Sequence, residues 1–129
     1  MTSLSAIVCD GDPESRRAAV TLVSECGFEV AGEFDLAVSA VAIAELVGPT
    51  VVVLDLSLPG MSSLKAIPLL HDAVPGCEIV VCSAYETVRP AALRAGATEV
   101  IDKGDLFRLE QVLRGIAERR IAASGVATQ

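Results

Sequence analysis

The chain has 129 residues, a length typical of a single domain with one hydrophobic core. Apolar side chains make up 52% of it, yet no run approaches the roughly 20 apolar residues of a membrane span, and no signal-like segment opens the sequence. We therefore expect a soluble cytoplasmic domain without a membrane partner. A net charge of −7 repels a phosphate backbone, so direct nucleic-acid binding by this chain is not expected.

The cysteines support a reducing compartment. Cys9, Cys26, Cys77 and Cys82 fall in apolar runs, form no C-x-x-C pair and have only His71 as an accompanying imidazole. Buried free thiols are expected rather than zinc ligands or disulfides, and His71, late in a predicted helix, is expected to be solvated.

The first half of the chain alternates between strand and helix patterns. Residues 5–9 (SAIVC) predict a strand, and residues 13–26 predict a helix with apolar residues along one face. Asp12 is expected to cap that helix and Gly27 to end it. Residues 28–34 then predict a strand, and residues 37–47 a helix that Gly48 and Pro49 stop.

The second half continues the alternation. Residues 50–54 (TVVVL) and 78–83 (EIVVCS) are continuous, β-branched runs, which belong inside a parallel sheet covered by helices on both faces. A helix over 62–74 lies between them, and Pro68 is expected to bend it or delay its regular start.

The last elements are a helix over 87–95, a strand over 98–101 and a final helix. That helix shows five apolar residues at helical spacing: Leu106, Leu109, Val112, Leu113 and Ile116. The domain is expected to cover residues 1–122, followed by a flexible tail over 123–129.

Five strand–helix units predict an α/β fold, a flavodoxin-like doubly wound sandwich with a parallel sheet of order 2-1-3-4-5. In that order the carboxyl ends of the first and third strands are neighbours at the switch point, where ligands bind. Asp10, Asp12 and Asp55 should converge there, with Ser83 and Lys103 at the same edge of the sheet.

This set of residues suits phosphoryl transfer to a carboxylate. Clustered acids stay ionised only beside a cation, and all-oxygen ligands favour Mg2+. Asp55 is the candidate nucleophile. Lys103 and Ser83 could stabilise negative charge on the phosphoryl oxygens.

The stretches VVVLDLSLPGMSSLKAI, IVVCSA and AGATEVIDK resemble the receiver domain of bacterial two-component response regulators over nearly the whole chain. The resemblance implies that Asp55 accepts a phosphoryl group from a sensor histidine kinase. It implies a Mg2+ site formed by Asp10, Asp55 and the backbone carbonyl of Ser57, with Ser83 and Lys103 contacting the phosphoryl group. Such a domain is no conventional enzyme, although it promotes its own phosphorylation and dephosphorylation.

The resemblance also implies a downstream partner, either an output domain or a second copy in a homodimer. DLSLPGMS and ALRAGAT favour the branch whose receivers usually precede a helix-turn-helix DNA-binding domain.

The chain departs from the family pattern at four positions. Gly11 stands where the second acid of the metal-binding pair is usual, which predicts weak Mg2+ binding, with Asp12 as an alternative ligand. Val100 replaces an aromatic switch residue. Gly104 replaces a proline and Ser63 a glycine, so altered loops are expected.

Two other functions fit parts of the sequence. A pseudo-receiver would keep the fold and act as a protein-interaction module without phosphorylation, which Gly11 and Val100 favour. The stretch CDGDPE also resembles the D-x-D motif of haloacid-dehalogenase phosphatases, with Asp10 as nucleophile and Asp12 as acid/base.

Overall fold

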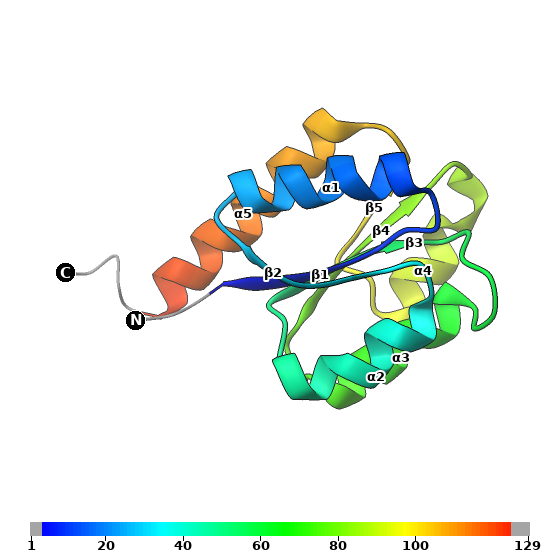
Figure 1. The fold of residues 1–129 in the computed structure, drawn as a ribbon, viewed down its shortest axis with the longest axis horizontal. Coiled ribbons are helices and arrows are strands. Elements are labelled where there is room, and N and C mark those ends of the chain that lie inside the picture. Colours follow the sequence, from blue (N-terminus) through cyan, green and yellow to red (C-terminus); the bar gives the residue numbers. More distant parts are fainter. Residues whose placement is uncertain (1–3, 125–129) are drawn as a thin grey trace.

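The computed structural model describes residues 4–124, which fold into one parallel five-stranded sheet of order β2-β1-β3-β4-β5 (Figure 1). This is the predicted flavodoxin-like order, and it confirms the fold class. The strands are β1 (Ser5–Cys9), β2 (Glu29–Phe34), β3 (Val51–Asp55), β4 (Glu78–Ser83) and β5 (Glu99–Asp102).

Helices cover both faces of the sheet. Figure 1 shows α1 and α5 together on one face and α2, α3 and α4 on the other. The helices are α1 (Pro13–Glu25), α2 (Ala37–Val47), α3 (Ser63–Ala73), α4 (Arg89–Ala95) and α5 (Leu106–Ala123), with a 3-10 turn, η1 (Glu86–Val88), before α4.

The sheet separates two apolar layers because successive side chains of a strand point to opposite faces. In β1, Ala6 and Val8 pack under α1 and α5, whereas Ile7 and Cys9 pack on the opposite side. All five residues of β3 are buried, as its continuous apolar sequence predicts for a central parallel strand. The last of them is Asp55, so the core itself fixes a carboxylate at the carboxyl edge of the sheet.

Most predicted elements are confirmed within one or two residues, and the differences have local causes. The predicted fourth helix is divided into η1 and α4, with Pro90 near the start of α4. Pro68 does not delay α3, which begins at Ser63 after Ser62 accepts a hydrogen bond from the Leu64 N–H. No helix in the described part of the chain is long and apolar enough to cross a membrane. Residues 125–129 of the predicted tail lie outside the described residues, and α5 extends to Ala123.

Two predictions about single side chains were wrong. His71 is half-buried rather than solvated, because its ring nitrogen Nε2 lies 2.8 Å from the carbonyl oxygen of Gly96, at the end of α4. All four cysteines are free thiols, as predicted, but Cys82 is only partly buried because it lines a cavity.

Candidate functional site

Three charged residues meet at the carboxyl edge of the sheet. Asp10 directly follows β1, Asp55 ends β3, and Lys103 directly follows β5. The Lys103 ammonium lies 2.7 Å from Asp55 Oδ2 and 3.1 Å from Asp10 Oδ1. Both carboxylates are almost buried, at 3% exposed for Asp55 and 6% for Asp10, so the lysine compensates charges that water hardly reaches.

Asp10 is held in its charged form. Burial alone would raise the pKa of its carboxyl group, but hydrogen bonds outweigh this effect and lower the pKa below its usual value of 3.8. The donors are the Ser15 hydroxyl to Oδ2 at 2.6 Å, the Asp12 N–H to Oδ1 at 2.9 Å, and Lys103. At neutral pH Asp10 is therefore available as a charged oxygen ligand.

Lys103 is held in its charged form by the same contacts. Its partial burial would lower the pKa of the ammonium, but hydrogen bonds to Asp55 and Asp10 raise it above 10.5. The next residue, Gly104, has φ +95°. Proline, with φ fixed near −65°, cannot adopt this conformation, so the turn that presents Lys103 differs from the proline-containing turn of the family.

Asp12 acts as a helix cap. Its Oδ2 accepts a hydrogen bond of 2.8 Å from the Ser15 N–H in the first turn of α1, and its side chain is exposed. This confirms the interpretation of Asp12 as a cap. Asp10 and Asp55, by contrast, face the same lysine.

The donor set suits a hydrated Mg2+ ion. Mg2+ keeps several waters and is typically bound through one or two carboxylates. Asp10 and Asp55 supply two, and the Ser57 N–H donates to Asp55 Oδ1 at 3.2 Å, so the Ser57 backbone adjoins the Asp55 carboxylate. Within residues 4–124, no group of three or more Asp, Glu, His or Cys side chains is placed as a metal site.

Ser83 is at the predicted edge, but its hydroxyl points elsewhere. The Oγ atom donates to the Tyr85 carbonyl at 3.2 Å and accepts from the Tyr85 N–H at 3.0 Å. Ser83 is 2% exposed and is absent from the lining of the cavity beside Asp55. In this state, Ser83 therefore stabilises the loop after β4.

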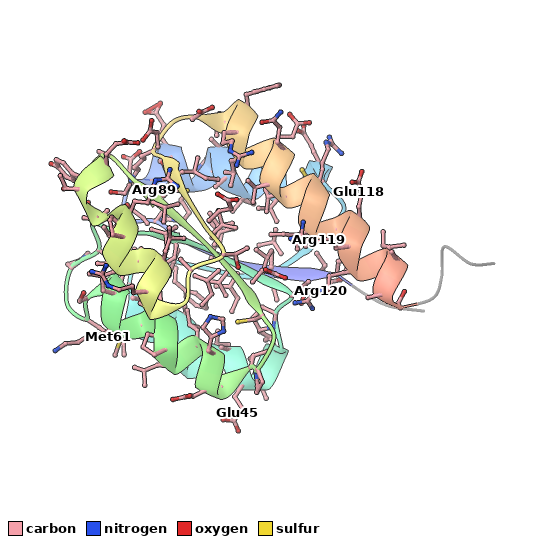
Figure 2. All side chains as sticks on the ribbon, turned by 180° about the vertical axis from the view of Figure 1, so that it is seen from behind. Glu45, Met61, Arg89, Glu118, Arg119 and Arg120 are labelled. Carbon is pink, nitrogen blue, oxygen red and sulfur yellow. The ribbon has the colours of Figure 1, made fainter. Side chains whose placement is uncertain are left out.

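Val100 is buried in β5, as expected for a strand residue, and its carbonyl accepts a hydrogen bond of 2.7 Å from Arg89. Arg89 is labelled in Figure 2, at the start of α4. This contact ties α4 to the edge strand at the position where the family usually carries its aromatic switch.

Three supporting residues were not predicted. Ser15 donates to Asp10 Oδ2, and the Arg16 guanidinium donates to the Asp10 carbonyl at 2.8 Å. Ser63, 1% exposed, donates its hydroxyl to the Asp55 carbonyl at 2.7 Å. A signal for Ser15 existed, because a residue in the first helical turn, three positions after the cap, faces back toward the preceding loop. Ser63 gave no such signal, since its contact depends on where α3 packs.

This chain is similar to the receiver domains of response regulators. The family model described as the response regulator receiver domain matches residues 6–114. A protein-glutamate methylesterase/protein-glutamine glutaminase of Myxococcus xanthus is 31% identical over 92% of this chain, which spans only 37% of that protein. The structure is similar to the receiver domain of the putative response regulator NarL from Mycobacterium tuberculosis, with TM-score 0.81 and 21% identity, covering 92% of this chain and 98% of the other.

A third similarity is to the CheX-CheY-BeF3-Mg2+ complex from Borrelia burgdorferi, with TM-score 0.78 and 17% identity over 88% of each chain. At these identities the two structural matches show the shared fold.

Proposed function

Because the chain belongs to the response regulator receiver family, we propose that Asp55 accepts a phosphoryl group from the phosphohistidine of a sensor kinase. The observation that carries the proposal is the position of Lys103, whose ammonium bonds to both Asp55 and Asp10. A buried carboxylate beside a fixed cation and a second carboxylate combines a nucleophile with the means to neutralise phosphoryl charge.

The transfer forms a bond between an Asp55 carboxylate oxygen and phosphorus, while the bond from phosphorus to the donor imidazole nitrogen breaks. The electron pair of that bond stays on the imidazole. Lys103 stabilises the negative charge on the phosphoryl oxygens, as an ammonium does in other phosphoryl-transfer sites.

Asp10, Asp55 and the Ser57 carbonyl would hold Mg2+, which supplies further charge neutralisation when bound. The CheY complex from B. burgdorferi contains Mg2+ together with BeF3, which supports the presence of a metal in this fold. With Gly11 in place of an acid, we propose that the affinity for Mg2+ is low.

Ser83 would contact the phosphoryl group after its hydroxyl leaves the Tyr85 backbone. Its two present hydrogen bonds are both to one residue of the β4–η1 loop, so their loss would free that loop. Phosphorylation would thereby change the surface that an output domain, a second copy or another partner contacts.

A pseudo-receiver without phosphorylation is the second candidate, favoured by Gly11 and by Val100. The haloacid-dehalogenase interpretation is not supported, since the family match and the sheet order are those of receivers and Asp12 caps α1.

The test is incubation of the purified chain with acetyl phosphate and Mg2+, read by intact mass. The natural chain should gain one phosphoryl group and Asp55→Asn none, because an amide lacks the nucleophilic oxygen. Asp12→Asn is the matched control, since asparagine also caps helices and should leave the uptake intact. Uptake by Asp55→Asn would refute the assignment, and no uptake by the natural chain would favour the pseudo-receiver.

A further inference from the structure

A cavity of about 310 Å3 lies between α1 and α5, next to Asp10 and Asp55. Its floor is formed by the sheet, through Val8, Val53 and Cys82. The helices contribute Ala18 and Ala19 from α1 and leucines from α5, so most of the lining is apolar. The volume is at the lower end of the range for small-molecule sites.

The cavity exists because α1 presents short side chains to α5. At Ala18 and Ala19 the helix has single methyl groups where a larger apolar residue would fill the space, and Ser15 turns its hydroxyl toward Asp10. On the opposite wall, Leu109 is buried and Leu106 is 46% exposed. The space therefore lies between packed elements and is partly open to solvent.

The polar end of the cavity is strongly acidic. Four carboxylates contribute to the lining, from Asp10, Asp12, Glu14 and Asp55, against the single ammonium of Lys103. Glu14 is exposed, and its carboxylate makes no hydrogen bond or ion pair with any residue between 4 and 124. The lysine is engaged by Asp55 and Asp10, so the end of the cavity carries an excess of negative charge.

We propose that this cavity is a binding site for a small organic cation, an ammonium group carried on a compact apolar body such as a phenyl ring or a short branched alkyl chain. The apolar body would fill the space between Ala18 and Leu109, and the ammonium would lie among the carboxylates, nearest the free Glu14. Without Mg2+, an anion would meet repulsion there, and a neutral molecule would gain only the apolar contacts. The proposal deepens the proposed function, since it uses the same carboxylates, but it requires no phosphoryl transfer.

The test is a titration with 2-phenylethylammonium, in the presence of EDTA, followed through the backbone amide signals of α1 and α5. The neutral 2-phenylethanol is the matched probe, and it should bind about tenfold more weakly. Added salt should weaken binding of the cation and leave the alcohol unaffected. Glu14→Gln should weaken binding of the cation by about two- to fivefold, which is the range expected for the loss of one exposed ion pair.

Ala18→Leu should fill the cavity and weaken binding of both probes by about tenfold or more, because the larger side chain occupies the space that the apolar body would fill. Ala42→Leu, on the exposed side of α2, is the control and should bind both probes like the natural chain. A melting curve of each variant shows that it is folded.

Equal affinity for the cation and the alcohol would overturn the charge argument, and unchanged binding by Ala18→Leu would overturn the location. No binding of the cation to the natural chain would overturn the proposal as a whole. Phosphoryl uptake from acetyl phosphate is measured separately, so failure of cation binding with intact uptake refutes only this site. Loss of uptake with intact cation binding refutes only the phosphoacceptor.

Discussion

Ser15, in the first turn of α1, contributes to the low pKa of Asp10. Ser15 donates the shortest of the hydrogen bonds to its carboxylate, at 2.6 Å, and the interaction lies between a buried strand end and the first turn of α1. A hydrogen bond to the charged form of a carboxyl group lowers its pKa. Ser15 is therefore a positioning residue for Asp10.

Ser15→Ala should raise the pKa of Asp10 toward 3.8, because it removes the strongest of the effects that oppose burial. The measurement is an NMR titration of the Asp10 carboxyl carbon. Ser24→Ala, an exposed serine on the same helix, is the control and should leave the pKa unchanged. An unchanged pKa in Ser15→Ala would show that Lys103 and the Asp12 N–H suffice to lower the pKa of Asp10.

Position 11 has room for an aspartate side chain in place of Gly11. Its φ is not positive, and a Cβ atom there would lie 3.7 Å from Leu58 Cδ2, an ordinary contact. Gly11→Asp should therefore tighten Mg2+ binding by about tenfold, or about 1.4 kcal/mol, by adding a third carboxylate to Asp10 and Asp55.

Titration of the two proteins with Mg2+, followed by calorimetry, compares the dissociation constants directly. Gly11→Asn is the matched control, of similar size but without charge. Equal affinity of Gly11→Asp and the natural chain, with both folded in EDTA, would mean that position 11 does not face the metal.

The sequence was sufficient to place residues whose position follows from the end of a strand. Asp10, Asp55 and Lys103 each follow or end a buried strand, so the sheet order alone brings them together. Side-chain direction could not be predicted in the same way. The Ser83 hydroxyl points to the Tyr85 backbone because a local hydrogen bond there replaces a contact toward Asp55.

At the scale of elements, a buried hydrogen bond joins α3 to β3. The Ser63 hydroxyl donates to the carbonyl of Asp55, the last residue of β3. A glycine, usual in the family at this position, could not form this bond. The loop that the sequence predicted to be altered is thus fixed to Asp55 rather than loosened.

Ser63→Ala should lower the free energy of unfolding by about 1–2 kcal/mol, since it leaves a buried carbonyl without its side-chain donor. Urea unfolding gives the value, and Ser39→Ala on α2 is the comparison, because Ser39 makes no side-chain hydrogen bond in the described structure. Equal stability of the two variants would mean that water replaces the Ser63 hydroxyl at no cost.

Element boundaries were predictable where capping chemistry is local. Asp12 begins α1 and Gly48 ends α2, as their side-chain types predict. The alternative that Pro68 delays the start of α3 was wrong, because that start depends on the Ser62 cap and on tertiary packing, with Ile67 and Leu70 fully buried on either side of Pro68. His71 was misjudged for a similar reason, since its partner Gly96 is 25 residues away in the sequence.

At the scale of the whole molecule, the ion pairs of Lys103 connect strands β1, β3 and β5 at one edge of the sheet. The pKa of Asp10 is lowered on folding, so its contribution to stability is present above pH 3.8 and is lost as pH falls through the lower, folded-state pKa. The pKa of Lys103 is raised, so its contribution is present below pH 10.5 and is lost as pH rises through the folded-state pKa.

Lys103→Met should therefore be less stable than the natural chain at neutral pH, by about 1–2 kcal/mol. This loss is smaller than the loss expected when a fully buried ion pair is broken, because the Lys103 side chain is 27% exposed. The difference should shrink below pH 3.8 and above pH 10.5. Urea unfolding of both proteins across the pH range is the measurement, and a difference that does not vary with pH would contradict the role of the ion pairs.

We propose that Asp55 is the residue that carries the phosphoryl group. Borohydride reduces an aspartyl phosphate to homoserine, so treatment of the chain after acetyl phosphate, followed by peptide mass analysis, marks the acceptor chemically. We expect homoserine at position 55. Homoserine at position 10 or 12 instead, or at no position in a chain that has gained phosphate, would contradict the account.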